Sequence, residues 1–356
     1  MNAAITKIGP NQEAMLWHGD CVNFVASLPR NSVRLVVTSP PYLTGKAYEG
    51  DLSFEAWYHQ QETLIHLLAD KVLVPGGSVC WQTGNYVTPS GGIVPLDSVL
   101  YELFTRRGFV LRNRIVWHFR HGLHCKNRFS GRYEVISWYT LPGADYVFNL
   151  DAVRVPQRYP NKKHFKGPKV GQLSCNPAGA NPGDCWDIPN VKCNHVEKTR
   201  HPCQFPVELA ERLVLALSNP GDLVIDPFMG VGTTLCAAVR NGRKGAGSEL
   251  VDDYVRIAAT RVGAALDGTL RVRAPGPAVF EPASSEPSFP EIIWNEDGRL
   301  LEVYLSNESG LAEWIPGEDA DVALLRSDIT RRVVGCALRP PAGSNKPILT
   351  TLGGGK

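Results

Sequence analysis

The chain has 356 residues, of which 43% are hydrophobic and 20% are charged, and its formal net charge at pH 7 is +2. This length predicts two domains, or one large domain with an appendage. No apolar run reaches the roughly 18 residues of a membrane span, and no signal-peptide core is present, so we expect neither membrane insertion nor export. The nine cysteines include no CxxC pair. We therefore expect reduced thiols and a cytoplasmic location.

The charge is distributed unevenly along the chain. Residues 1–272 carry 29 Lys and Arg against 23 Asp and Glu, whereas residues 273–356 carry 8 against 12. Two stretches contain no acid: Leu103–Tyr133 has eight basic residues and Ala152–Gly183 has six. Such stretches favour a polyanionic partner over a merely solvated surface.

Short apolar runs alternate with amphipathic helical patterns, which predicts an α/β fold with a mainly parallel sheet. In chain order we expect strand Met15–His18, strand Arg34–Thr38, helix Phe54–Lys71, strand Gly77–Thr83, helix Pro95–Arg107, helix Pro206–Leu217, strand Leu223–Asp226, helix Thr233–Asn241, strand Gly245–Glu249 and helix Asp252–Leu266. Two further β-rich runs, 109–119 and 133–140, are predicted to pair antiparallel at the sheet edge.

The remaining segments differ in composition. Residues 143–200 are rich in Gly, Pro, Asn and Lys without periodicity, which indicates an irregular insertion. Residues 272–290 have the Pro, Ser, Glu and Ala content of a linker. Residues 291–340 alternate like strands and predict a small acidic β-rich module, and 341–356 are predicted to be a tail.

The sequence TSPPY (Thr38–Tyr42) follows the second predicted strand. The two prolines fix their own φ angles and push the preceding residues to extended geometry. A rigid turn is the simplest interpretation of such a dipeptide. A hydroxyl before the prolines and an aromatic ring after them are also consistent with a functional elbow.

A second motif, GDLVIDPFMGVGTTLCAAV (221–239), combines a strand, a glycine-rich turn and a helix start. Gly230 and Gly232 let the backbone approach a ligand closely, and Thr233 can cap the following helix. The spacing of a dinucleotide motif and the Gly-Lys of a phosphate loop are absent. Asp226 suits a positively charged ligand, and Glu249, ending the next strand, suits ribose hydroxyls. The two carboxylates predict S-adenosylmethionine.

Together the two motifs resemble those of DNA amino-methyltransferases, which methylate the exocyclic nitrogen of cytosine or adenine. That family has a catalytic (S/N/D)PP(Y/F/W) motif and an FxGxG-like cofactor loop. The match covers about 14–270, with TSPPY before a target-recognition region at about 119–200 and DPFMGVGTT after it, the circularly permuted order called β. The resemblance implies a doubly wound, Rossmann-like methyltransferase sheet with an irregular recognition insertion and a small C-terminal β-rich module.

The resemblance also implies roles at the elbow. Ser39 Oγ and the Pro40 carbonyl would accept the two amino hydrogens of a flipped base and direct its lone pair at the methyl group. Pro41 would keep the elbow rigid and Tyr42 would stack on the base. Transfer would be direct, without a covalent nucleophile. Serine at the first motif position usually accompanies cytosine in this family, so N4-methylcytosine is favoured, with N6-methyladenine as the alternative.

Further residues are expected to bind the cofactor. Asp20 would lie near its adenine, and the segment HPCQFP (201–206) would lie beside its methionine end. The family commonly has lysine where Phe205 stands, so any role of that lysine is lost. The expected cofactor residues are Asp20, Gln204, Asp226, Pro227, Phe228, Gly230, Gly232, Thr233 and Glu249.

Duplex DNA is the expected partner, with a homodimer and a cognate restriction endonuclease as further partners suggested by the resemblance. Orphan host methylation, without such an endonuclease, is the alternative that the resemblance leaves open. The loop 119–132 and the insertion 143–200 are predicted to form one DNA-facing side together. The expected phosphate contacts are Arg120, Lys126, Arg128, Arg132, Lys162, Lys163 and Lys166.

Other interpretations compete with this one. The tripeptide PCQ (202–204) is also the nucleophile signature of cytosine carbon-5 methyltransferases, but their cofactor loop precedes it. Five residues could suggest zinc without a regular ligand spacing, and we predict no metal: Cys185, Cys193, His195, His201 and Cys203. A DNA-binding module without catalysis, and amino-methyl transfer to RNA or protein glutamine, are the remaining alternatives.

Overall fold

A computed structural model describes residues 4–46, 49–122, 124–160, 162–192 and 195–274, and the backbone of six strands further along the chain. The chain divides into two compact units, Met1–Gly276 and Pro277–Lys356. Among the described residues, no helix combines the length and apolar character that crossing a bilayer requires.

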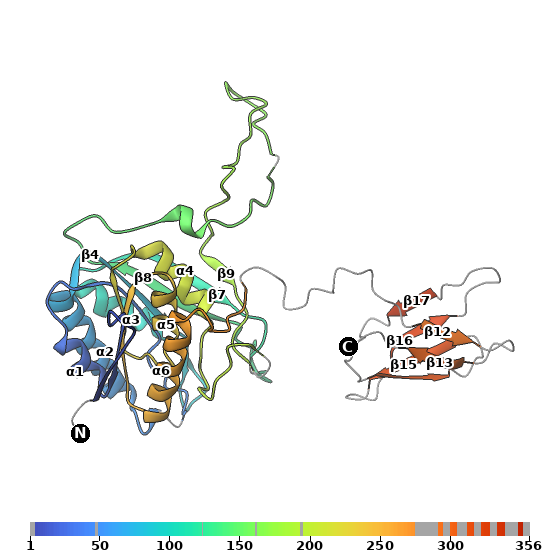
Figure 1. Cartoon of the computed structure of the whole chain (residues 1–356), viewed down its shortest axis with the longest axis horizontal. Helices are drawn as coiled ribbons and strands as arrows, with labels where there is room; N and C mark the ends of the chain where they lie inside the picture. Colours follow the sequence, from blue (N-terminus) through green and yellow to red (C-terminus); the bar gives the residue numbers. More distant parts are fainter. Residues whose placement is uncertain are drawn as a thin grey trace. The chain divides into compact units, whose positions relative to one another are not determined.

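The first unit contains a nine-stranded sheet with the order β1-β2-β11-β10-β3-β4-β8-β7-β9 (Figure 1). Strands β2, β11, β10, β3 and β4 are parallel, β8 is antiparallel to both β4 and β7, and β1 is antiparallel to β2. The strands are β1 (Ala4–Ile8), β2 (Ala14–His18), β3 (Val33–Thr38), β4 (Leu73–Thr83), β7 (Val110–His118), β8 (Tyr133–Thr140), β9 (Cys185–Asp187), β10 (Leu223–Asp226) and β11 (Lys244–Glu249).

Strands β3 and β10 are neighbours in the middle of this sheet. Val36 pairs with Ile225 in the parallel register. Both strands therefore end at the same edge, and the segments that follow them, TSPPY and the glycine-rich turn, meet there. This edge, at the carboxyl ends of the parallel strands, is where open α/β sheets place their ligands.

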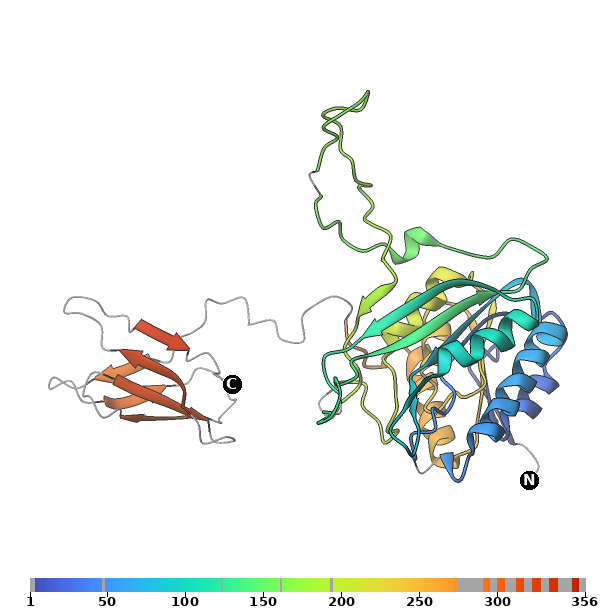
Figure 2. The same ribbon diagram turned by 180° about the vertical axis from the view of Figure 1, so that it is seen from behind.

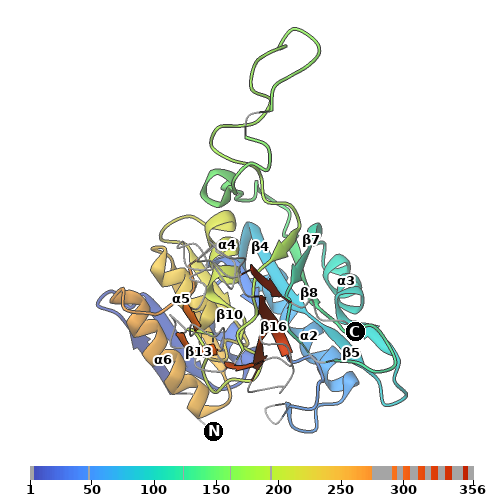
Figure 3. The same cartoon turned by 90° about the vertical axis from the view of Figure 1, so that its right-hand side faces the viewer.

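Helices cover both faces of the sheet (Figures 2 and 3). On one face lie α1 (Cys21–Ser27), α2 (Phe54–Leu67) and α3 (Leu96–Arg106), and on the other lie α4 (Val207–Leu217), α5 (Thr233–Arg240) and α6 (Asp252–Leu266). Each layer has its own hydrophobic cluster. Trp57 and Trp81 are buried in the first and Leu213 and Val262 in the second. The α/β fold predicted from the sequence is confirmed.

The ten predicted elements of the first unit occur within a few residues of their expected bounds. The predicted helix that starts at Phe54 ends at Leu67 and continues as one π-helical turn, Leu68–Val72. Besides β9, four short elements were not predicted. They are β1, whose residues are almost all exposed and so show no alternation, the two-turn helix α1, and the hairpin of β5 (Asn85–Val87) and β6 (Ile93–Pro95).

The antiparallel pair β7–β8 forms as predicted, but it is not at the sheet edge. The three-residue strand β9 pairs in parallel with β7, with Trp186 opposite Trp117. The outer strand on this side is therefore β9, which lies inside the predicted insertion and is too short for its pattern to be visible in the sequence.

Most of the insertion is irregular, as expected. After a short 3-10 turn (Leu150–Val153), residues 154–183 form an arm that leaves the body of the unit and returns to β9 (Figure 1). Two isolated bridges, Val155 with Ala180 and Lys163 with Leu173, hold its two sides together.

The second unit is rich in strands, as predicted. Strands β12 (Glu291–Trp294) and β13 (Leu300–Tyr304) form one antiparallel pair, and β14 (Ala312–Pro316), β15 (Val322–Ser327), β16 (Val333–Leu338) and β17 (Ile348–Thr351) form a four-stranded antiparallel sheet. The boundary of the predicted tail is wrong, because β17 lies within 341–356. Most of the predicted linker, 275–290, lies outside the described residues.

Candidate active site

The side chains of Trp57 and Glu49 hold the backbone of the TSPPY elbow in place by hydrogen bonds. Trp57 Nε1 donates a 2.8 Å hydrogen bond to the Pro41 carbonyl, and the Tyr42 amide donates a 3.1 Å bond to Glu49 Oε1. Within the described part of the chain, no donor reaches the Pro40 carbonyl. The elbow thus keeps that carbonyl available as an acceptor for a ligand.

A chain of polar groups runs from the elbow into the sheet. Ser39 Oγ lies 2.7 Å from Tyr42 Oη, and the Tyr42 hydroxyl donates a 3.1 Å bond to Glu134 Oε2. Gln82 Nε2 donates a 2.7 Å bond to the same oxygen. Sequence reasoning missed Glu134 and Gln82. Glu134 could have been noticed in the sequence, because it is the first acidic residue after the acid-free stretch Leu103–Tyr133.

Burial dominates the electrostatics of this chain. Desolvation raises the pKa of the Glu134 carboxyl above its usual range, although the hydrogen bonds from Gln82 and Tyr42 lower it. Desolvation also raises the pKa of Tyr42 well above its usual value, and the neighbouring Glu134 adds to the rise. The tyrosine therefore keeps its proton, and Glu134 is a stronger base than an exposed glutamate.

Asp226, the last residue of β10, is completely buried. Its Oδ1 accepts a 2.6 Å bond from Thr38 Oγ1 and a 3.0 Å bond from the Phe228 amide, and its Oδ2 accepts a 2.9 Å bond from Thr234 Oγ1. Burial raises the pKa of this carboxyl to about 6, against the lowering effect of these bonds. The carboxylate faces protein donors, not open space.

The glycine-rich turn needs glycine for its backbone. Gly230 and Gly232 have φ angles of 50° and 77°, a region that other residues rarely adopt. A Cβ atom at Gly232 would lie 3.0 Å from Ala258 Cβ. Gly232 is also the N-cap of α5, so the prediction that Thr233 caps this helix is wrong. The Thr233 hydroxyl instead accepts a 3.1 Å bond from Arg261 Nη1.

Two acids stand at the ends of neighbouring strands β2 and β11. Glu249 Oε1 accepts a 2.8 Å bond from the Val251 amide, and burial raises the pKa of this carboxyl despite nearby backbone donors. Asp20 Oδ1 accepts 3.0 Å bonds from the amides of Val22 and Asn23 and so caps α1. The amide of Gly19 donates to the Glu249 carbonyl, which joins the two ends.

The segment HPCQFP packs against the glycine-rich turn. His201 Nε2 lies 3.2 Å from the position that a Gly230 Cβ would occupy. Gln204 is buried and fully bonded within the protein, accepting from Thr199 and donating a 2.8 Å bond to the Glu197 carbonyl. The Pro227 carbonyl accepts a 2.6 Å bond from Ser248. Gln204 and Pro227 thus shape the turn through contacts with the protein.

The chain is similar to proteins of a known family. Residues 33–260 match the family model N6_N4_Mtase, described as DNA methylase. The chain belongs to this family. It is a DNA amino-methyltransferase, and S-adenosyl-L-methionine is its cofactor.

Individual relatives agree with this assignment. The chain is 46% identical over 243 residues to the type II methyltransferase M.BglII of Bacillus subtilis, covering 68% of this chain and 67% of the relative. It is 31% identical over 265 residues to the DNA adenine methyltransferase YhdJ of Escherichia coli, covering 73% and 86%. A DNA modification methylase of Thermus thermophilus, solved with S-adenosyl-L-methionine, has 32% identity and a TM-score of 0.50, covering 70% and 95%. The PvuII methyltransferase, at 23% identity and a TM-score of 0.54, shares the fold over 69% of this chain.

The residues at the sheet edge fit this cofactor. Gly230 and Gly232 give the turn its left-handed φ angles, with their missing Cβ positions facing His201 and Ala258. The half-buried carboxylate of Glu249 stands at the next strand end, where a hydroxyl donor can reach it. When bound, the cofactor supplies an electrophilic methyl group. Thr38, the first residue of the elbow, contacts Asp226, so Ser39 and the Pro40 carbonyl directly follow the bond that joins the two motifs.

The predicted DNA contacts of this methyltransferase fall into two groups. The loop 119–132 follows the carboxyl end of β7 and therefore lies at the active-site edge. In it, Lys126 and Arg128 are exposed, Arg120 Nη2 lies 3.2 Å from Asp187 Oδ2, and Arg132 donates to the Gly131 carbonyl. The other group, Lys162, Lys163 and Lys166, lies on the arm.

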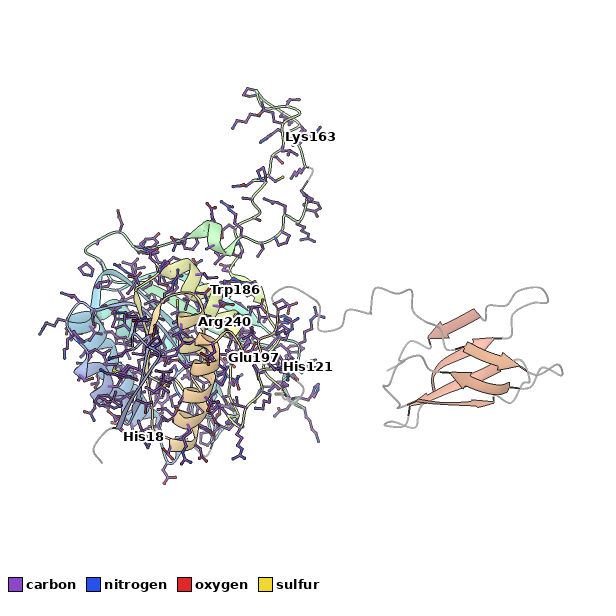
Figure 4. The ribbon with its side chains drawn as sticks, viewed as in Figure 1. His18, His121, Lys163, Trp186, Glu197 and Arg240 are labelled. Carbon is purple, nitrogen blue, oxygen red and sulfur yellow. The ribbon has the colours of Figure 1, made fainter. Side chains whose placement is uncertain are left out.

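The arm (154–183) does not form one surface with the loop, so the expectation is wrong for this part of the insertion. The end of the insertion does lie beside the loop, because Asn190 Nδ2 donates a 2.8 Å bond to the His121 carbonyl. The chain enters the arm beside the carboxyl end of α4, where the Asn149 amide donates to the Ala216 carbonyl, on the side of the sheet opposite the active-site edge. Figure 4 shows Lys163 on the arm, far from His121 in the loop and from His18 at the end of β2. The reason is that β8 runs antiparallel and carries the chain away from the site before the arm begins.

Four of the five cysteines and histidines that could suggest zinc are described in the structure: Cys185, His195, His201 and Cys203. Among the described residues, no group of three or more His, Cys, Asp or Glu side chains is placed to hold a metal ion. Cys185 and Cys203 are exposed, and Cys193 lies outside the described residues.

Proposed function

We propose that this DNA amino-methyltransferase transfers the methyl group to N4 of cytosine within a specific sequence of duplex DNA. The observation that carries the proposal is the group at the first position of the catalytic motif, the hydroxyl of Ser39, 2.7 Å from the Tyr42 hydroxyl. A hydroxyl donates to one neighbour and accepts from another, whereas a carboxylate only accepts. Serine at this position is typical of the cytosine-specific members that the motif resembles.

The elbow geometry supports direct transfer to a flipped base. Ser39 Oγ and the Pro40 carbonyl accept the two amino hydrogens, which turns the nitrogen lone pair toward the methyl group. The Trp57 bond and Pro41 fix the elbow, and the ring of Tyr42 lies against the base.

The cofactor residues divide into two kinds. We assign Glu249 to the ribose hydroxyls and Asp20 to the adenine side, with Phe228, Gly230 and Gly232 lining the site. We assign Asp226, Gln204, Pro227 and Thr233 to the shape of the turn, because their side chains or carbonyls are bonded within the protein. In this assignment the buried Asp226 carboxylate stabilises the positive charge of the cofactor electrostatically, without a direct contact.

Adenine N6 is the second candidate, because the relative YhdJ is an adenine methyltransferase. The same two acceptors serve either amino group. Mass spectrometry of nucleosides from duplex DNA methylated in vitro decides the point. We expect N4-methylcytidine, and N6-methyladenosine as the sole product would overturn the proposal. Absence of any labelled methyl transfer to DNA, RNA or protein would favour a module without catalysis.

We further propose that the enzyme acts beside a cognate restriction endonuclease, as the type II names of its relatives suggest, and that it forms a homodimer. Sequencing the methylome of a methylation-deficient host that expresses the chain would give the recognition sequence. If an extract of the source cells cleaves unmethylated DNA at that sequence, the result would support the endonuclease. Analytical ultracentrifugation, which measures the mass in solution, would test the homodimer.

A further inference from the structure

Glu134, a partly buried acid connected to Ser39, has no role in the transfer described above. Glu134 lies at the amino end of β8, beside the carboxyl end of β4, and reaches Ser39 through one hydroxyl. We propose that Glu134 accepts the proton that the target amine releases, delivered through the hydroxyls of Ser39 and Tyr42. Glu134 is thus a positioning and proton-accepting residue that does not itself touch the base.

The donors and acceptors along this chain have one consistent direction. Glu134 Oε2 is an acceptor, because the amide nitrogen of Gln82 can only donate to it. The Tyr42 hydroxyl therefore donates its hydrogen to Glu134, and its oxygen accepts from Ser39. The hydrogen of Ser39 then points at Tyr42. Its remaining lone pair is left to face the amino group, which is the state that the reaction requires.

The proton balance of the reaction supplies the need for such an acceptor. The amine lone pair forms the N–C bond, the electron pair of the broken S–C bond stays on sulfur, and the nitrogen becomes positively charged. The nitrogen then gives a proton to Ser39 Oγ, Ser39 gives its own proton to Tyr42 Oη, and Tyr42 gives its proton to Glu134 Oε2. The methylated amine and the glutamic acid end neutral, and solvent later takes the proton from Glu134.

The surroundings of Glu134 suit this task. Among the described residues, the charged or titratable groups that face it are Tyr42 from the elbow and Lys192 from the segment between β9 and α4, with the neutral Gln82 from β4. Burial raises the pKa of Glu134, which strengthens it as a base, and Lys192 limits the rise. Tyr42 stays neutral during the relay, because it gives its own proton to Glu134 as it takes one from Ser39.

The test is Glu134→Gln, which keeps a carbonyl oxygen for Tyr42 and Gln82 but cannot take the proton there. Single-turnover methyl transfer is followed at saturating cofactor and DNA from about pH 5 to 9, and we expect a loss of about 10²-fold near pH 7. The wild-type rate should fall as the pH drops through the raised pKa of Glu134, because the protonated acid accepts nothing. That acid limb should be missing in the variant, whereas cofactor and DNA affinities stay unchanged.

A second variant, Tyr42→Phe, interrupts the same chain while leaving Glu134 in place. The double variant should be no slower than the worse single variant, because both remove one relay. A wild-type rate in Glu134→Gln, or an equal loss at every pH with the acid limb retained, would overturn the proposal. The inference rests on amino methylation and not on cytosine, so the nucleoside product, measured in the same reactions, tests the proposed function separately.

Discussion

Thr38 Oγ1 donates a 2.6 Å hydrogen bond to Asp226 Oδ1, and this bond joins the last residues of β3 and β10 across 188 positions of sequence. The rest of the TSPPY elbow follows Thr38, and the glycine-rich turn begins at the residue after Asp226. One buried contact therefore fixes the two motifs of the candidate active site relative to each other.

Thr38→Val should destabilise the protein, because it removes a donor from a carboxylate that has no access to water. We expect the free energy of unfolding to fall by about 1–3 kcal/mol in urea denaturation. The matched control is Thr83→Val at the end of β4, where the threonine hydroxyl is buried without a hydrogen-bond partner among the described residues. The control should be neutral or stabilising. An equal fall of the free energy of unfolding in the two variants would show that the Thr38–Asp226 bond does not stabilise the protein.

The stability of the protein should depend on pH through Asp226. Burial raises its pKa from 3.8 to about 6 in the folded state. Between these values the unfolded chain has lost the proton and the folded protein retains it. The free energy of unfolding therefore falls as the pH rises through this window, by about 3 kcal/mol in total. Urea denaturation of the wild type and of Asp226→Asn at several pH values from about 4 to 7 should give curves that diverge. Parallel curves would contradict the raised pKa.

The sequence predicted the parts of this site that depend on local patterns. TSPPY and the glycine-rich turn follow strands that were visible as β-branched runs, and the order of the strands brings them together. The positions of Gly230, in the turn after β10, and Glu249, at the end of β11, follow from the strand–turn–helix pattern. The helix bounds were also close, because α4 and α6 have a regular apolar stripe.

The sequence could not show which polar groups form hydrogen bonds with one another. Asp226 was expected to meet a ligand, yet its partners are Thr38 and Thr234, and only the pairing of β10 with β3 makes the first contact. Glu134 was missed because it reaches the elbow across β4 from β8. The separation of Lys163 from the loop depends on the antiparallel direction of β8, which composition does not reveal.

Glu249→Gln should weaken cofactor binding by removing the charge that accepts the ribose hydroxyls. We expect the Kd for S-adenosyl-L-methionine to rise about tenfold or more, since a hydrogen bond to a charged group contributes about 1.5–3 kcal/mol. Calorimetric titration measures it. Asp253→Asn, a carboxylate 66% exposed in the first turn of α6, is the control for the charge and should leave Kd unchanged. A normal Kd for the Glu249 variant would remove this residue from the site.

The loop and the arm should contribute to DNA binding separately. Replacing Lys126 and Arg128 with alanine should reduce the slope of log affinity against log salt by about 2, and Lys163→Ala with Lys166→Ala should do the same. Only the loop pair should also slow methyl transfer at saturating DNA, because only the loop lies at the active-site edge. Arg30→Ala with Arg106→Ala, on the layer of α1–α3, controls for the loss of charge. An unchanged salt slope would identify the affected segment as plain solvated surface.

The second unit should be dispensable for methyl transfer. Every residue assigned to the active site precedes Ala274, and residues 273–356 carry 12 acidic against 8 basic residues, which opposes DNA binding. A chain ending at Ala274 keeps the contact in which the Arg273 amide donates to Glu197 Oε1, and Glu197 in turn accepts from the Val207 amide at the start of α4. We expect this chain to retain its single-turnover rate and to bind DNA at low salt at least as tightly as the full chain. A chain ending at Leu270 loses the Arg273 contact and should be less stable in urea. If the Ala274 chain folds but transfers no methyl group, the second unit belongs to the catalytic machinery after all.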